Sequence, residues 1–127
     1  MIMYELKTIF QFGAAHQLRN YNGKCENLHG HNWKIEVFVK GETLGENGLL
    51  IDFKVIKETT LNILEELDHK FLNELEYFKD INPSSENIAR YLYEITSREL
   101  NNDTLEVSRI TVWESDSACA TYSPDNR

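Results

Sequence analysis

Cysteine is scarce in this chain, with Cys25 and Cys119 as the two cysteines among 127 residues. So few cysteines exclude a small fold held together by several disulfides, and we expect both side chains to be free thiols. No apolar run approaches the roughly 20 residues that a membrane-spanning helix needs. The first ten residues do not have the pattern of a signal peptide, because Glu5 and Lys7 interrupt their apolar residues. The sequence therefore predicts a cytoplasmic protein that does not enter membranes.

Positive charge is also in short supply. The chain has 13 Lys and Arg against 21 Asp and Glu, which gives a net charge of −8 and a pI near 4.9. This balance argues against a general binder of nucleic acid or of anionic membranes, although a few local cations could still hold a small anionic substrate. The length, with no internal repeat or linker, predicts one domain over residues 1–127.

Three of the four histidines occupy positions that suggest chemistry. If His29-Gly30-His31 lies in a strand, both imidazoles face the same side, about 6–7 Å apart at Cα. His16 falls on the apolar parity of the strand predicted before them. Three imidazoles with one open position are typical of a catalytic zinc site, so we predict one Zn²⁺ per subunit on His16, His29 and His31. The alternative is three surface histidines at strand ends.

The hydrophobic periodicity predicts an α+β fold in the order ββααββ. Alternating apolar positions indicate strands, and the 3.6-residue spacing indicates helices. We expect a four-stranded antiparallel sheet with two helices on one face, whose uncovered edges favour oligomerisation. The predicted strands cover residues 2–16, 29–40, 105–114 and 118–122, and the predicted helices cover 53–67 and about 83–101.

Four further residues are candidates for catalysis. Cys25 lies in a polar loop, where a nearby metal would favour a thiolate that acts as base or nucleophile; the alternative is a small buried hydrophobe. Asp68-His69 could be a histidine oriented by a carboxylate to move protons, or only a favourable helix end. Glu114, at a strand end, could accept two N–H donors of a planar heterocycle, or be a solvent-exposed acid.

Taken together, these motifs resemble the 6-pyruvoyltetrahydropterin synthase and 6-carboxytetrahydropterin synthase family. The matching pieces come in the family's order and span nearly the whole chain. They are Phe12-Gly13-Ala14-Ala15-His16, Cys25-x-x-x-His29-Gly30-His31-Asn32, Ile51-Asp52-Phe53, Leu67-Asp68-His69-x-x-Leu72-Asn73, Asn82-Pro83-Ser84-Ser85-Glu86 and Glu114-Ser115.

The resemblance implies a tunnelling fold, in which subunits join their sheets into a barrel and trimers stack into hexamers with active sites at subunit interfaces. It implies zinc on the three histidines and Cys25 as the proton acceptor. His69 would be the relay partner of Cys25, with Asp68 orienting His69. Glu114 would anchor the pterin ring and belong to the catalytic relay.

The spacing Cys-x-x-x-His-Gly-His is similar to that of the bacterial 6-carboxytetrahydropterin synthases of the queuosine pathway. This branch implies a zinc lyase that converts 7,8-dihydroneopterin triphosphate to 6-carboxy-5,6,7,8-tetrahydropterin, acetaldehyde and triphosphate. Arg19 and Lys24 are candidate triphosphate contacts. The alternatives are the 6-pyruvoyl synthase reaction on the same substrate, a zinc hydrolase and a zinc-binding module without turnover.

Overall fold

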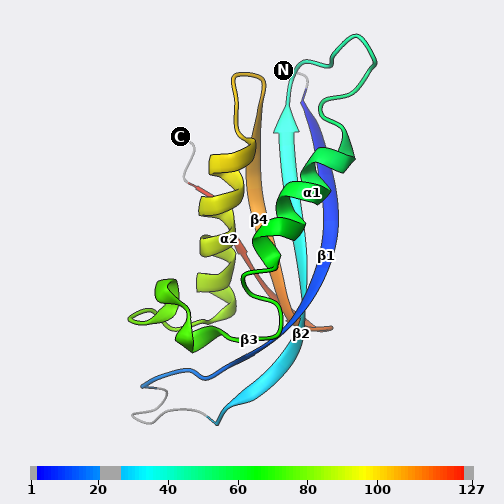
Figure 1. Cartoon of the computed structure of the whole chain (residues 1–127). Helices are drawn as coiled ribbons and strands as arrows, with labels where there is room; N and C mark the ends of the chain where they lie inside the picture. The colour runs from blue at the N-terminus through cyan, green and yellow to red at the C-terminus, as the bar shows by residue number, and fades with distance from the viewer. Residues whose placement is uncertain (1–2, 21–26, 125–127) are drawn as a thin grey trace.

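The fold is a five-stranded sheet with two helices packed on one of its faces (Figure 1). A computed structural model describes residues 3–20 and 27–124. The strand order across the sheet is β3-β1-β2-β4-β5. The elements are β1 (Tyr4–His16), β2 (His29–Gly41), α1 (Phe53–Leu64), β3 (Lys70–Phe71), the 3₁₀ turns η1 (Leu72–Glu74) and η2 (Glu76–Phe78), α2 (Ser85–Leu100), β4 (Leu105–Ser115) and β5 (Ala118–Tyr122).

The predicted α+β layout with both helices on one face is confirmed, but the four-stranded, wholly antiparallel sheet is wrong. The fifth strand, β3, pairs in parallel with β1 through Ala14 and Ala15. A two-residue strand has no periodicity that a sequence pattern could detect. Helix α1 also ends at Leu64, before the predicted residue 67, because the chain turns there to bring β3 beside β1.

Strand alternation builds the core and also sets the position of the candidate site. On the helix-covered face, the three long strands contribute buried side chains such as Phe12 on β1, Ile35 on β2 and Val112 on β4. Both helices begin at side-chain caps, since Asp52 accepts from the Lys54 N–H and Ser84 accepts from the Asn87 N–H. The same parity continues to the ends of the strands, where His16, His29, His31 and Glu114 follow the apolar residues.

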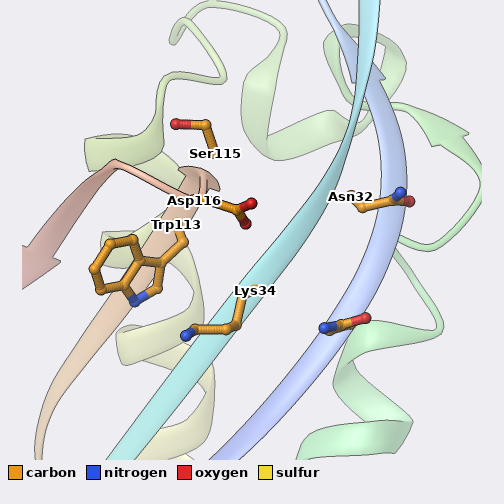
Figure 2. Close-up of a pocket in the computed structure, with 6 residues that line it drawn as sticks. Asn32, Lys34, Trp113, Ser115 and Asp116 are labelled. Carbon is orange, nitrogen blue, oxygen red and sulfur yellow. The ribbon is translucent and has the colours of Figure 1, made fainter.

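The opposite face of the sheet is polar. Glu36 pairs with Lys7 at 3.4 Å and accepts a 2.9 Å hydrogen bond from Nε1 of Trp113. Burial raises the pKa of Glu36, but this hydrogen bond and the nearby lysines outweigh burial and leave the pKa below its ordinary value. A hollow of about 320 Å³ opens on this face, where Lys34 lies over the Trp113 ring and Asp116 lies close by (Figure 2).

Within the described residues, no helix is both long enough and apolar enough to cross a membrane.

Candidate metal centre

Three histidines meet at one end of the sheet, on the helix-covered face. His16 on β1 is opposite His29 on β2, and Ala14 is opposite His31, so the antiparallel register places all three rings together. The ring centroids are 4.6 Å apart for His16 and His29, 5.1 Å for His16 and His31, and 4.6 Å for His29 and His31. One ligand nitrogen from each ring lies within 4.8 Å of the other two. The three imidazoles could therefore hold one metal ion.

The hydrogen bonds of two rings select the tautomer that a metal needs. His16 Nδ1 lies 2.7 Å from the Pro83 carbonyl, and His29 Nδ1 lies 2.8 Å from the Asn27 carbonyl. A carbonyl only accepts, so in both rings the proton is on Nδ1 and Nε2 presents a lone pair. Metal-binding histidines are oriented in the same way by their second nitrogen.

The two lone pairs explain why the site fits a cation. His16 Nε2 and His29 Nε2 are 3.1 Å apart. Two lone pairs at this distance repel one another unless a proton or a cation lies between them. Neighbouring ligands of a tetrahedral zinc ion with bonds of about 2.0–2.1 Å are separated by about 3.3 Å. The donor set, and the spacing of this nitrogen pair, therefore fit zinc.

Trp33 forms the floor of the cluster. Its side chain is fully buried, and its ring stands edge-on to His16 at 5.0 Å and to His31 at 5.2 Å. Its Nε1 donates to the Ala14 carbonyl at 3.3 Å. The indole thus restricts the rotamers of two imidazoles.

Two asparagines clamp the chain that follows His16 to the segment that precedes α2. Asn73 accepts from the Gln17 N–H at 2.9 Å and donates to the Gln17 carbonyl at 2.7 Å. Asn82 accepts from the Arg19 N–H at 2.8 Å and donates to the Arg19 carbonyl at 2.9 Å. We call these four bonds the asparagine clamp. Because Pro83 follows Asn82, the clamp also sets the carbonyl that holds the His16 ring.

Arg19, one of the two candidate triphosphate contacts, is engaged by backbone carbonyls. The Arg19 guanidinium donates to the Phe78 carbonyl at 2.7 Å and to the Asn73 carbonyl at 3.3 Å, so it serves the fold of the loop beside the cluster. Lys24 and the candidate proton acceptor Cys25 lie outside the described residues.

Glu114 lies closer to the histidines than the sequence predicts. Its Oε1 is 3.8 Å from His16 Nε2, and its Oε2 is 3.9 Å from His31 Nε2. A bulge between Trp113 and Ser115 leaves Glu114 without a partner on β5, and bulges often aim a side chain at a site. The Ser85 hydroxyl, at the start of α2, donates to Oε1 at 3.4 Å.

Asp68 and His69 form a separate pair beside β1. Asp68 Oδ1 accepts from the Gly13 N–H at 2.9 Å, and Asp68 Oδ2 lies 3.1 Å from His69 Nδ1. The Gly13 hydrogen bond, together with His69, holds the pKa of Asp68 below its ordinary value. The His69 side chain is 87% exposed, and its backbone is left-handed with φ of 60°. No hydrogen bond or ion pair joins this pair to the three histidines in the described part of the chain.

Comparison with known proteins now gives the family. The model of the 6-pyruvoyl tetrahydropterin synthase family matches residues 5–125. The chain belongs to this family. Membership confirms the prediction that the protein is an enzyme of this kind, and relatives named 6-carboxy-5,6,7,8-tetrahydropterin synthase are 26–37% identical to it.

Three family members illustrate the range of names. The 6-carboxy-5,6,7,8-tetrahydropterin synthase of Haemophilus influenzae is 28% identical, covering 94% of this chain and 99% of the relative. The dihydroneopterin monophosphate aldolase of Pyrococcus furiosus is 36% identical over 81% of this chain and 82% of the relative. The solved structure of Caenorhabditis elegans 6-pyruvoyl tetrahydropterin synthase is 25% identical, with a TM-score of 0.84 over 98% of both chains. The fold is thus shared across the family, whereas the names of these relatives describe different reactions.

Sequence reasoning identified the three histidines but not the groups that orient them. The carbonyls of Asn27 and Pro83 carry no side-chain signal. Asn73 and Asn82 both belong to the motifs that resemble the family. Asparagine side chains often form hydrogen bonds to backbone groups, so these two positions could have suggested such a role.

Proposed function

We propose that this protein is a zinc-dependent lyase that converts 7,8-dihydroneopterin triphosphate and water to 6-carboxy-5,6,7,8-tetrahydropterin, acetaldehyde and triphosphate. The observation that carries the proposal is the convergence of three imidazoles with their Nδ1 positions engaged, in a chain with several 6-carboxytetrahydropterin synthases among its relatives. The product belongs to queuosine, or 7-deazaguanine, biosynthesis. Zinc, when bound, supplies Lewis acidity that makes the carbon-bound protons of the substrate side chain more acidic.

The other residues receive the following roles. Cys25, as thiolate, removes a carbon-bound proton; its support is its place four residues before His29. His69 resets the thiol, and Asp68 orients the His69 ring at 3.1 Å. Glu114 accepts N–H donors of the pterin and belongs to the relay, supported by a half-exposed carboxylate beside the cluster.

We propose that active sites form between copies of the chain, in a hexamer built as a dimer of trimers whose sheets join into a barrel. The exposed His69 supports this arrangement, because its side chain is open to a neighbouring copy and, among the described residues, no hydrogen bond or ion pair joins it to its own cluster. Strand β3 covers only Ala14 and Ala15 of β1, which leaves much of that edge for pairing.

Incubation of the zinc-loaded protein with 7,8-dihydroneopterin triphosphate tests the reaction. We expect mass analysis to find 6-carboxy-5,6,7,8-tetrahydropterin and an enzymatic assay to find acetaldehyde in equal amount. Triphosphate release without acetaldehyde would indicate the 6-pyruvoyl reaction, and absence of turnover would favour a zinc-binding module. Cys25→Ala should lose most turnover and keep its zinc, whereas Cys119→Ala, an exposed cysteine on β5, is the matched control.

A second candidate function is favoured by the 36% identity to the Pyrococcus furiosus dihydroneopterin monophosphate aldolase. An aldolase breaks a carbon–carbon bond and leaves the phosphate ester intact. Parallel assays with dihydroneopterin monophosphate separate the two functions, since only the proposed synthase releases triphosphate from its own substrate.

A further inference from the structure

Among the described residues, the carboxylate of Glu114 is a charged group that lies beside the three-histidine cluster. The cluster lies across the ends of β1 and β2, and Glu114 approaches it from β4, on the same face of the sheet. Its two oxygens reach two different histidines, at 3.8 Å from His16 Nε2 and 3.9 Å from His31 Nε2. A carboxylate placed in this way faces the ligand nitrogens of two of the three imidazoles.

The distances are close to those of a closed zinc site. With Zn–N and Zn–O bonds of about 2.0–2.2 Å, a nitrogen and an oxygen on one tetrahedral ion are about 3.4 Å apart. The observed separations, one from each carboxylate oxygen, exceed this value by about half an ångström, so ligation requires a movement of the Glu114 side chain. The carboxylate is 39% exposed, so it has room to rotate.

The surroundings of Glu114 resemble those of a metal-binding carboxylate. Such ligands are usually oriented by a hydrogen bond from a neighbouring group. Ser85 Oγ donates to Oε1 at 3.4 Å from the first turn of α2. The bulge at Glu114 also frees the backbone from β5 there. By contrast Asp116, two residues later, lines the hollow on the opposite face (Figure 2).

We infer that Glu114 is a displaceable fourth ligand, which closes the metal centre until a substrate hydroxyl takes its place. The inference rests on the metal centre of the proposed function and adds a resting state to it. In that state Glu114 would hold the ion together with the three imidazoles. Withdrawal of its carboxylate when a polyol side chain binds would restrict the site to ligands that can replace it, and would leave Glu114 able to accept N–H donors.

Cobalt substitution of the full-length protein tests this inference without any turnover. Co²⁺ replaces zinc in such sites, and its visible absorption is several-fold stronger with four ligands than with five or six. We expect Glu114→Gln, which keeps the shape and removes the charge, to shift and weaken these bands. Chelator competition should find a loss of metal affinity in this variant. Asp116→Asn removes the same charge from the opposite face and should match the wild type in both measurements.

The outcomes separate this inference from the proposed function. An unchanged cobalt spectrum and affinity in Glu114→Gln would overturn the fourth ligand and leave the three-histidine centre standing. A wild-type protein that binds no Co²⁺ or Zn²⁺ would remove the centre itself. Glu114→Asp, whose shorter side chain retains the charge but draws it back from the ion, should resemble Glu114→Gln; a wild-type spectrum in this variant also contradicts direct ligation.

Discussion

At the scale of single residues, the site depends on which nitrogen of each imidazole carries the proton. His16 and His29 have their Nδ1 positions held by backbone carbonyls, which leaves both Nε2 atoms directed at one point. His16 is nearly completely buried, so its ring is also held by packing. The arrangement is preformed, since neither ring has to change its tautomer to accept a metal.

His31→Ala removes one of the three converging nitrogens. We expect bound zinc, measured by atomic emission after dialysis, to fall well below one ion per chain, because two protein nitrogens hold the ion less tightly than three. His69→Ala lies outside the cluster and should retain its zinc. A fully metallated His31→Ala protein would contradict the ligand assignment.

The backbone at His69 gives a second prediction for single residues. A non-glycine residue in the left-handed region is less stable by about 1–2 kcal/mol, and here the bonds to Gly13 impose that conformation. We expect the free energy of unfolding of His69→Gly, measured by denaturant titration, to exceed that of His69→Ala by about 1 kcal/mol. Both variants should lose turnover. Equal stability would mean that the left-handed backbone at residue 69 carries no strain.

Asp68 makes the stability of the fold depend on pH. Its pKa is lower in the folded chain than its ordinary value of 3.8, because Gly13 and His69 stabilise the charged form. A lowered carboxyl pKa stabilises the fold above the unfolded pKa, and this contribution is lost as pH falls through the folded pKa. We expect melting temperatures of the wild type to fall more steeply below about pH 4 than those of Asp68→Asn. Parallel curves for the two proteins would contradict this role.

At the scale of elements, the asparagine clamp joins the end of β1 to the start of α2. We expect Asn82→Ala to lose two hydrogen bonds to Arg19 and to let Pro83 move away from His16. Removal of such supporting groups lowers metal affinity about 10–100-fold. Chelator competition measures this change, and Asn62→Ala, an exposed site on α1, is the control. Wild-type affinity in Asn82→Ala would separate the clamp from the metal centre.

The elements also explain which parts of the structure the sequence could predict. The alternation along β1 and β2 predicted the side on which His16, His29 and His31 lie, because strand parity is a local property. The two-residue β3 and the early end of α1 depend on pairing with β1. This contact is distant in sequence, since Gly13 on β1 and Asp68, which it binds, are 55 residues apart. The position of Glu114 beside the histidines depends on the bulge and on strand neighbours, neither of which a local pattern contains.

At the scale of the whole molecule, the sheet has one face covered by helices and one polar face. The metal centre is at one end of the covered face, and the exposed Asp68–His69 pair lies beside β1, directly before the short edge strand β3. Within residues 3–20 and 27–124, two parts of the proposed active site are therefore not joined by a hydrogen bond or ion pair.

This separation predicts that activity requires assembly. We expect native mass spectrometry to find six chains of 14.9 kDa per particle. Mixing inactive His31→Ala with inactive His69→Ala should restore part of the activity, because mixed assemblies contain some sites with both intact residues. Failure to complement, with mixed assemblies present, would mean that each chain uses its own His69.

The packing of Trp33 has a practical consequence. Its indole touches two of the three imidazoles and is shielded from water, whereas the other tryptophan, Trp113, lies across the sheet beneath a lysine. Imidazoles quench tryptophan emission, and an ion drawing on their lone pairs alters that quenching. We therefore expect the intrinsic fluorescence of the chain to change, without any label, when a metal ion binds to its histidines.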